Sequence, residues 1–188
     1  MDRPGAQQVA DRALILCALV RRGSIEHVIA STDGDPLRIR QGEAARLESD
    51  RWLDREHLID ALEDEERRLL DAPSGSWPVA ATTDALWRRE ALGALLWALQ
   101  HLAAMSAYGA EFEQQALDDA ITRYGSVESF REEGLLRSEE ELERAWMEAD
   151  AWYGATEGRE GDDASIASIA SERYRAFSWL RDADARPA

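Results

Sequence analysis

Apolar side chains recur at intervals of three and four residues along most of the chain, and no stretch alternates strictly between apolar and polar positions. The first spacing places side chains on one face of an α-helix, whereas strict alternation is typical of a half-buried strand. The pattern therefore predicts an all-α protein. We expect residues 1–188 to fold as one compact domain, since a chain of this length can bury a sizeable core.

Glycine, proline and capping residues divide this pattern into separate helices. We expect a first helix over about 7–21 that ends at Gly23, and a short helix after it that is capped by Ser24. The sequence Asp-Gly-Asp-Pro at 33–36 predicts a turn, with its proline in the first turn of the next helix. Residues 37–70 are then expected to form two or three helices.

The most apolar segment follows a loop that is expected at 72–81. Thr82 or Thr83 can cap the helix that follows, so we expect that helix to span about 83–102. Alanine or leucine occupies nearly every side of it. A helix that is apolar all round is buried on all sides, so this segment is predicted to be the central helix of the domain.

Three further helices are expected in the second half of the chain. One spans 114–124, and a second begins at the capping box of Ser138 and the three glutamates that follow it. A loop rich in glycine and aspartate is expected at 154–163. The last helix carries one stripe with a spacing of three and four residues, formed by Ile166, Ile169, Arg173, Phe177 and Leu180 and joined by Tyr174.

Acidic residues outnumber basic ones, which excludes several classes of partner. The chain has 38 aspartates and glutamates against 22 basic residues, a formal net charge of −16. This charge repels phosphate backbones and anionic lipids, so we expect neither nucleic-acid binding nor membrane docking. Every basic residue is an arginine, because the sequence has no lysine. Lysine-dependent phosphate loops, Schiff-base chemistry and pyridoxal-phosphate attachment are therefore excluded.

The negative charge is concentrated in one part of the chain. Residues 111–163 contain 17 acidic residues and 5 arginines, so −12 of the −16 lies there. One interpretation is a solvated helical surface that keeps the protein soluble. The other is a surface that binds a basic protein partner. Such a partner could be a nucleic-acid-binding protein whose nucleic-acid site this surface would occupy.

Cysteine and histidine offer little for metal or cofactor chemistry. Cys17 is the only cysteine and lies on an apolar helix, so we expect a core residue and neither a disulfide nor a cysteine-based zinc site. His27, His57 and His101 share no motif that would put two ligands on one helical face. We therefore expect no metal and no cofactor.

We expect the protein to act in the cytoplasm. The chain starts without the basic and apolar segments of a secretory signal. Its longest apolar runs, 13–20 and 91–99, are shorter than the roughly 20 residues that a membrane-spanning helix needs.

The most unusual cluster lies on the central helix. Trp87, Glu90, Trp97 and His101 follow the spacing of three and four that places them on one side of that helix. A carboxylate among tryptophans on an apolar helix is costly unless it is paired.

Two explanations of this carboxylate remain open. In the structural one, Glu90 forms an ion pair with a buried arginine such as Arg173 or Arg137. In the functional one, Glu90 lines a small-molecule pocket with His101 and arginines, and the aromatic side chains form its walls. A carboxylate that is enclosed and paired, with no adjoining pocket, would remove the second explanation.

Four strings in the chain are similar to one known family. They are Trp87-Arg-Arg-Glu-Ala-Leu-Gly-Ala-Leu-Leu-Trp-Ala-Leu99, Arg12-Ala-Leu14, Leu135-Leu-Arg-Ser138 and Glu172-Arg-Tyr-Arg-Ala-Phe-Ser-Trp-Leu180. On these residues the chain resembles the bacterial family called domain of unknown function 4272. The resemblance implies a helical fold over most of the chain, and it brings no established reaction, cofactor or partner.

The concentrated charge and the lack of a catalytic motif favour a protein that binds another macromolecule. We expect a protein partner, in the manner of an immunity, antitoxin-like or accessory protein, and a basic partner is one of the candidates. The alternative is a small-ligand-binding protein or an enzyme. Its site would include Arg88, Glu90, Trp97, His101, Arg137 and Arg173, with Trp87 and Glu172 beside them. A purely structural subunit is a third interpretation.

Overall fold

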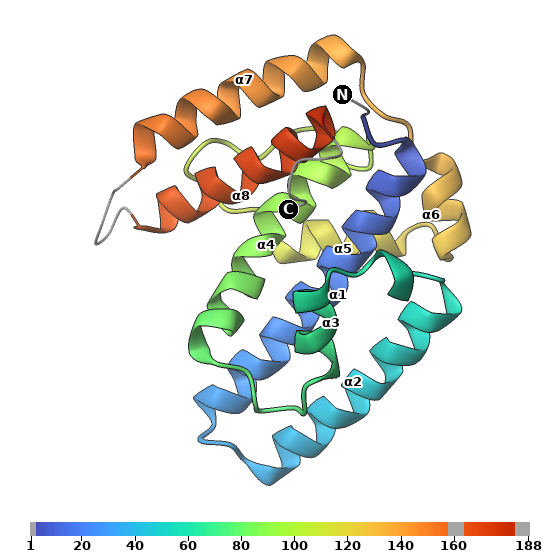
Figure 1. Ribbon diagram of the computed structural model, residues 1–188, viewed down its shortest axis with the longest axis vertical. Helices are drawn as coiled ribbons and strands as arrows, with labels where there is room; N and C mark the ends of the chain where they lie inside the picture. Colours follow the sequence, from blue (N-terminus) through green and yellow to red (C-terminus); the bar gives the residue numbers. More distant parts are fainter. Residues whose placement is uncertain (1–2, 158–163, 183–188) are drawn as a thin grey trace. The chain divides into compact units, whose positions relative to one another are not determined.

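The computed structural model describes residues 3–157 and 164–182. These residues form eight α-helices and one short 3-10 helix, with no strand among them, which confirms the all-α prediction (Figure 1). The elements in chain order are α1 (Ala6–Ser31), α2 (Pro36–Arg55), η1 (Ile59–Ala61), α3 (Asp64–Asp71), α4 (Val79–Ala98), α5 (Gln114–Thr122), α6 (Val127–Glu133), α7 (Glu139–Thr156) and α8 (Ala164–Arg181).

The contacts of the chain divide it into two compact units. The smaller unit is Leu14–Arg88, and the larger unit is Met1–Ala13 together with Arg89–Ala188. The division falls within α1 and α4, so each of these helices contributes residues to both units. The expectation of a single domain stays a prediction.

In the smaller unit, α1 does not end at Gly23 as predicted. It continues to Ser31, and the hydroxyl of Ser24 donates to the carbonyl of Val20 instead of capping a new helix. A Cβ at Gly23 would lie 3.0 Å from the Cβ of Ala85 in α4. This glycine therefore permits close packing of two helices, which local sequence signals do not distinguish from a helix end.

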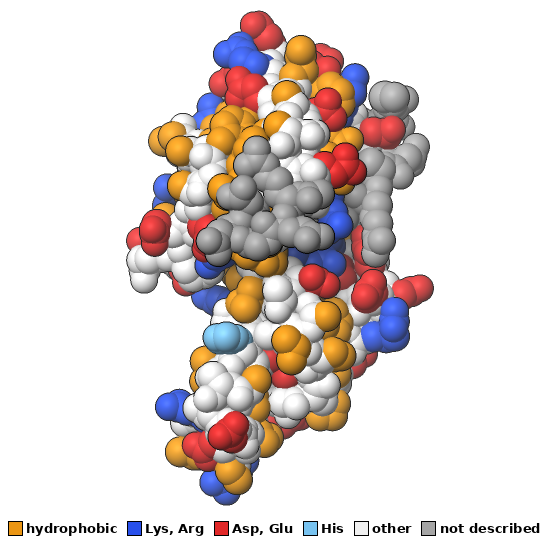
Figure 2. All heavy atoms as spheres, turned by 90° about the vertical axis from the view of Figure 1, so that its left-hand side faces the viewer, with side chains coloured by type: hydrophobic (Ala, Val, Ile, Leu, Met, Phe, Trp, Pro, Cys, Tyr) orange, Lys and Arg blue, Asp and Glu red, His pale blue; other side chains and the backbone are white. Residues whose placement is uncertain are grey.

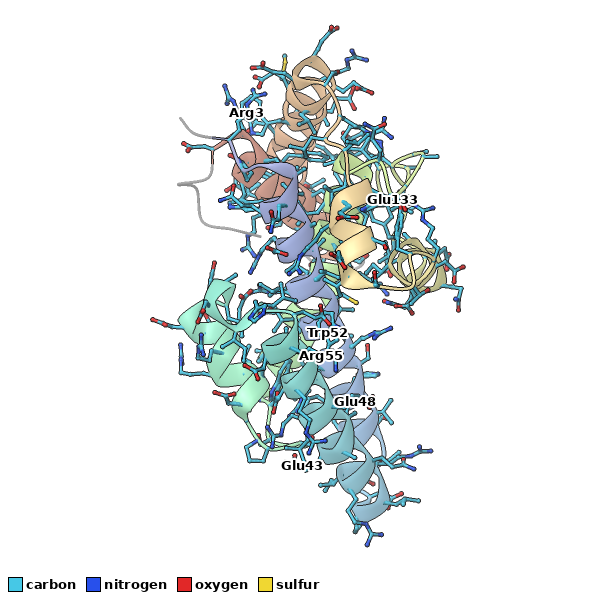
Figure 3. The ribbon with its side chains drawn as sticks, turned by 90° about the vertical axis from the view of Figure 1, so that its right-hand side faces the viewer. Arg3, Glu43, Glu48, Trp52, Arg55 and Glu133 are labelled. Atoms are coloured by element: carbon cyan, nitrogen blue, oxygen red, sulfur yellow. The ribbon has the colours of Figure 1, made fainter. Side chains whose placement is uncertain are left out.

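The turn at 33–36 and its proline are found as predicted. Asp35 caps α2 by accepting a hydrogen bond of 2.9 Å from the backbone N–H of Leu37, and Pro36 is the first residue of the helix. Between residues 37 and 70 the chain forms α2, η1 and most of α3, in agreement with the two or three helices expected. Glu43, Glu48, Trp52 and Arg55 follow one another along α2 (Figure 3).

The loop between α3 and α4 is held to α1 by a buried ion pair. Glu26 is 3% exposed and accepts hydrogen bonds from the backbone N–H groups of Gly75 and Trp77. Arg22 pairs with Glu26 at 2.8 Å and donates to the carbonyl of Ala72 at 2.8 Å. Two charged side chains one helical turn apart thus fix the path of this loop.

Helix α4 lies four residues earlier than predicted, at 79–98 instead of 83–102. It starts directly after Pro78, whose carbonyl accepts from the N–H of Thr82, so Thr82 is inside the helix and does not cap it. Leu92, Leu95 and others in its last turns are at most 1% exposed, which agrees with the expected burial. Its first half does not agree, because Leu86 and Trp87 are only half-buried and Val79 is 79% exposed.

The end of α4 is a Schellman motif. Gln100 has a φ of 63°, and its N–H donates to the carbonyl of Trp97 at 3.0 Å. The N–H of His101 donates to the carbonyl of Leu96 at 2.9 Å. This pair of bonds is typical of a helix that ends shortly before a left-handed residue, here Gln100. The placement of His101 on the face of the central helix is therefore wrong, because the chain turns away before it.

In the larger unit α7 and α8 lie side by side (Figure 1). The indole N–H of Trp146 donates to Ser178, and Tyr153 stacks on Tyr174 with ring centroids 4.8 Å apart. Ile169, Phe177 and other members of the predicted stripe of α8 are buried, whereas Ile166 at the start of the helix is half-buried.

The capping box at Ser138 is present, and hydrogen bonds from Ser138 lower the pKa of Glu141. Helix α5 ends two residues before the predicted 124, and α6 was not expected. Of the loop predicted at 154–163, residues 154–156 belong to α7. The rest of that loop, from 158 on, lies outside the described residues.

Cys17 is 6% exposed, which confirms it as a core residue. No helix within the described part of the chain is long and apolar enough to cross a membrane.

Figure 2 shows acidic, basic and hydrophobic side chains interspersed over the face that it displays.

Candidate functional site

The carboxylate of Glu90 is completely buried and paired with Arg173. Glu90 lies on α4 and Arg173 on α8, and both are 0% exposed. The guanidinium donates from Nε and Nη2 to Oε2 of Glu90, at 3.1 and 2.8 Å. The other carboxylate oxygen accepts from the backbone N–H of Phe112 at 2.9 Å. Both oxygens of Glu90 are therefore hydrogen-bonded within the larger unit.

Arg173 also binds the chain that follows α4. Its Nη1 donates to the carbonyls of Ser106 and Ala107, and its Nη2 donates to the carbonyl of Ala110 at 2.7 Å. With the two bonds to Glu90, all five N–H hydrogens of the guanidinium have acceptors in the protein. A ligand at this position would have to displace them.

Phe112 completes the cluster and depends on a glycine. Its ring lies 4.8 Å from the Arg173 guanidinium, a cation–π distance. A Cβ added at Gly93 would overlap this ring. Gly93 lies three residues after Glu90, on the same side of α4. The glycine thus lets the segment that supplies the Phe112 N–H pack directly on the helix backbone.

His101 forms a separate buried network. It is 2% exposed, and its Nε2 lies 3.1 Å from the carbonyl of Phe130. Because a carbonyl only accepts, Nε2 carries the hydrogen, and Nδ1 accepts from the hydroxyl of Tyr124. Arg123 donates to the same hydroxyl at 2.8 Å. Burial lowers the pKa of His101 to about 4, helped by the charge of Arg123, so the imidazole is neutral near pH 7.

Arg137 occupies the carboxyl end of α4. Its Nε donates to the carbonyl of Trp97 at 2.9 Å, and its Nη2 donates to the carbonyls of Leu102 and Ala103. The guanidinium also lies 4.4 Å from the Trp97 ring, which packs edge-on against Phe177. A cation at a helix carboxyl end compensates the unpaired carbonyls there.

The remaining residues of the predicted cluster lie elsewhere. Trp87 and Arg88 belong to the smaller unit, where Arg88 pairs with Glu66 at 3.0 Å. Glu172 is 7% exposed and binds Arg175 at 2.8 Å. The structure therefore joins Glu90 and Arg173, and it places His101 and Arg137 in hydrogen-bond networks of their own.

Several residues of this region were not expected from the sequence. Phe112, Tyr124 and the carbonyls of residues 106–110 come from segments without a motif. Gly93 was the one available signal, because a glycine within an apolar helix indicates a close approach by another segment. Within the residues that the structure describes, no group of three metal-ligating side chains gathers.

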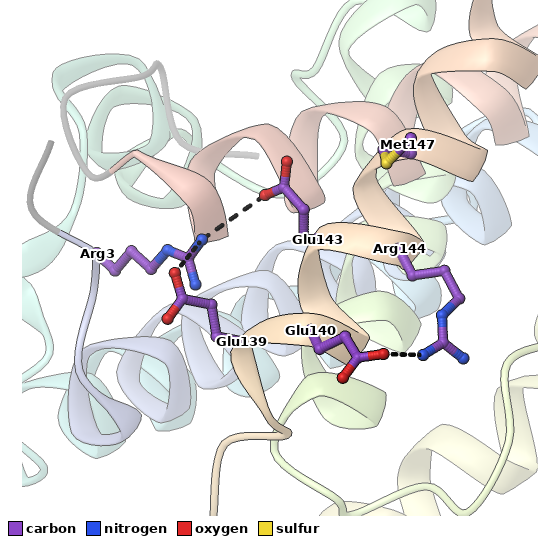
Figure 4. Close-up of a pocket in the computed structure, with 6 residues that line it drawn as sticks. All are labelled: Arg3, Glu139, Glu140, Glu143, Arg144 and Met147. Atoms are coloured by element: carbon purple, nitrogen blue, oxygen red, sulfur yellow. Dashed lines mark hydrogen bonds and ion pairs between the residues drawn. The ribbon is translucent and has the colours of Figure 1, made fainter.

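The surface of the larger unit carries a groove of about 640 Å³ beside the start of α7 (Figure 4). Five of its six lining side chains are charged, and the sixth is a methionine. The residues that line it are Arg3, Glu139, Glu140, Glu143, Arg144 and Met147. The sequence placed the excess of acidic residues in this stretch, but it gave no sign of the groove.

Ion pairs within the groove differ in exposure. Arg3 bridges Glu139 and Glu143 at 3.1 and 3.6 Å, and Arg144 pairs with Glu140 at 3.2 Å (Figure 4). The side chains of Glu139 and Glu140 are 81% and 87% exposed, whereas that of Glu143 is 35% exposed. The first two carboxylates are therefore accessible to an external cation.

Comparison with known proteins identifies a family. A family model described as Domain of unknown function (DUF4272) matches residues 2–186. Neither the curated proteins nor the solved structures include a significant match. Since the match covers almost all of the 188 residues, the chain belongs to the DUF4272 family, as the resemblance of its tryptophan-rich helix had indicated.

Proposed function

We propose that this protein acts by binding a basic protein partner, in the manner of an immunity, antitoxin-like or accessory protein, and not by catalysis. The observation that carries the proposal is the distribution of charge. Residues 111–163 hold −12 of the formal charge of −16, and α7 presents carboxylates to solvent within that stretch. Such a surface attracts a partner of opposite charge and speeds the encounter with it.

The arrangement of the buried charges supports the same proposal. Glu90, Arg173 and Arg137 are held by donors and acceptors of the chain itself, and His101 is neutral near pH 7. These groups stabilise the ends and crossings of helices. We place the action of the protein in the cytoplasm, where a lone thiol such as Cys17 stays reduced.

The test is affinity capture from the native host with the full chain as bait. Washes at low and at high ionic strength are compared, because salt weakens contacts between exposed charges. We expect one or more basic proteins to be enriched at low ionic strength. The purified partner should then bind with an affinity that falls as salt rises.

Failure to enrich a specific protein under either condition would contradict the proposal. A small-ligand function remains as the competing outcome. It would appear as a melting temperature that rises with a metabolite in the absence of any protein partner.

A further inference from the structure

The groove beside α7 combines one exposed apolar side chain with accessible carboxylates. Met147 lies at one end of it and is 60% exposed, a large fraction for an unbranched apolar side chain. Glu139 and Glu140 lie about two helical turns before Met147 on the same helix. A ligand that fits this surface has an apolar group for Met147 and cations for the two glutamates.

The ion pairs already present in the groove do not occupy these carboxylates firmly. Exposed pairs such as Arg144 with Glu140 contribute little to stability, because water and salt compete for both partners. An incoming cation can replace the arginine at small cost. Glu143 is different, since it is less exposed and pairs with both Arg3 and Arg181.

The helix dipole explains only part of this arrangement. Carboxylates in the first turn of a helix stabilise its amino end, and Glu141 does so through the capping box with Ser138. That effect accounts for the sign of the charge at Glu139 and Glu140. It does not account for the exposure of Met147, which lies beyond the first turn of the helix.

We infer that this groove is the docking site for a basic amphipathic helix of the protein partner. An apolar side chain of that helix would pack on Met147, and flanking arginine or lysine side chains would reach Glu139 and Glu140. Long basic side chains suit the groove because their methylene stems can pack against Met147 while their charged ends reach the carboxylates. The inference rests on the proposed function and names the surface and the partner chemistry.

The probe is a fluorescein-labelled synthetic peptide of about 18 residues, long enough for four to five helical turns. One face carries leucine and its flanks carry lysine and arginine. Anisotropy measures its binding to the full chain in about 50 mM NaCl, where contacts between charges are only partly screened. A second peptide keeps the cations but replaces the leucines by serine. Spermine serves as a cation without an apolar face.

Two variants of the protein test the two halves of the groove. The double variant Glu139→Gln/Glu140→Gln should weaken peptide binding by at least about fivefold, and Met147→Ser by at least about threefold. The matched control is Glu48→Gln/Glu133→Gln, which changes the net charge equally at two exposed positions that do not line the groove. We expect the control to bind within about twofold of the unchanged protein. Circular dichroism verifies that all variants are folded.

Four outcomes would overturn the docking site. They are no binding of the leucine peptide, equal binding of the serine peptide, displacement by spermine at equal concentration, and equal weakening in the control variant. A stable dimer by light scattering that Met147→Ser dissociates would assign the groove to a second copy of the chain. If a captured partner binds the groove variant and the unchanged protein equally, the docking site is wrong while the proposed function stands.

Discussion

At the scale of single residues, the larger unit is organised by a carboxylate that water does not reach. A buried charge is tolerated only where other groups replace its hydration. Glu90 has the Arg173 guanidinium on one oxygen and the Phe112 N–H on the other. Arg173 in turn has carbonyl acceptors from the segment after α4. The pair therefore joins α4, α8 and that segment.

Replacing Glu90 by glutamine should destabilise the protein strongly. The amide keeps the shape of the side chain but leaves the buried guanidinium of Arg173 without a counter-charge, which costs roughly 3–5 kcal/mol. Urea unfolding measures the change in the free energy of unfolding. The control Glu139→Gln breaks an exposed pair with Arg3 and should cost less than about 1 kcal/mol. Similar values for the two variants would contradict the structural role of Glu90.

Two glycines in helices should respond in opposite directions to substitution by alanine. At Gly93 the new methyl group would overlap the Phe112 ring, so we expect a loss of about 1–3 kcal/mol in the free energy of unfolding. At Gly154 in α7 a Cβ would have no neighbour within 4 Å. Alanine favours a helix more than glycine does, so Gly154→Ala should raise the free energy of unfolding by up to about 1 kcal/mol. A stabilising Gly93→Ala would show that Phe112 does not pack against α4.

Protonation of His101 should make stability depend on pH. The pKa of His101 is about 4 in the folded protein, against an ordinary value of 6.5. As pH falls from about 6.5 to about 4, His101 becomes protonated in the unfolded chain but stays neutral in the folded protein. The free energy of unfolding therefore decreases over this window, by up to about 3 kcal/mol.

The measurement compares urea unfolding of the unchanged protein with that of His101→Gln between pH 7 and about 4. The part of the slope due to His101 should be absent in the variant. His27→Gln, at an exposed histidine, is the matched control and should keep it. If the free energy of unfolding changes with pH by the same slope in all three proteins, His101 is not the source of the pH dependence.

At the scale of elements, the decisive features lie where helices end. Helix α4 stops because Gln100 adopts a left-handed conformation and the Schellman bonds satisfy two of its last carbonyls. The N–H groups of Leu135 and Arg137 bind the carbonyls of Leu99 and Ala98. A segment distant in sequence thus caps the helix, and for this reason the end at 98 was not visible in the local pattern.

Replacing Arg137 by lysine should weaken this cap although the charge is kept. A lysine cannot reproduce the planar donors that bind the Trp97, Leu102 and Ala103 carbonyls while lying against the indole ring. We expect a loss of about 1–3 kcal/mol in the free energy of unfolding. Arg144→Lys, at an exposed ion pair, should change it by less than about 0.5 kcal/mol. Equal effects would contradict the capping role.

At the scale of the whole molecule, α1 and α4 contribute to both compact units. Unfolding of either unit shortens both helices and removes the hydrogen bonds at their new ends. We therefore expect calorimetry to record one transition whose measured enthalpy equals the van't Hoff enthalpy. Two resolved transitions would contradict the single domain that the sequence predicts.

The sequence by itself determined the features that depend on neighbours in the chain. The helical class follows from apolar spacing, and the starts of α2 and α7 follow from Asp35 with Pro36 and from the capping box at Ser138. It also required a partner for Glu90, because a carboxylate on an apolar helix is costly alone.

Only the tertiary structure decided which distant groups meet. In the fold, Glu90 pairs with Arg173 and not with Arg137. Gly23 lies where α1 packs closely against α4, and it does not end a helix. His101 lies beyond the end of α4 and binds Tyr124, and a groove lies beside Met147. Periodicity and caps act within a few residues, whereas these contacts join segments many residues apart. The contacts of Glu90 and His101 form because a buried charge or imidazole is costly without a hydrogen-bond partner.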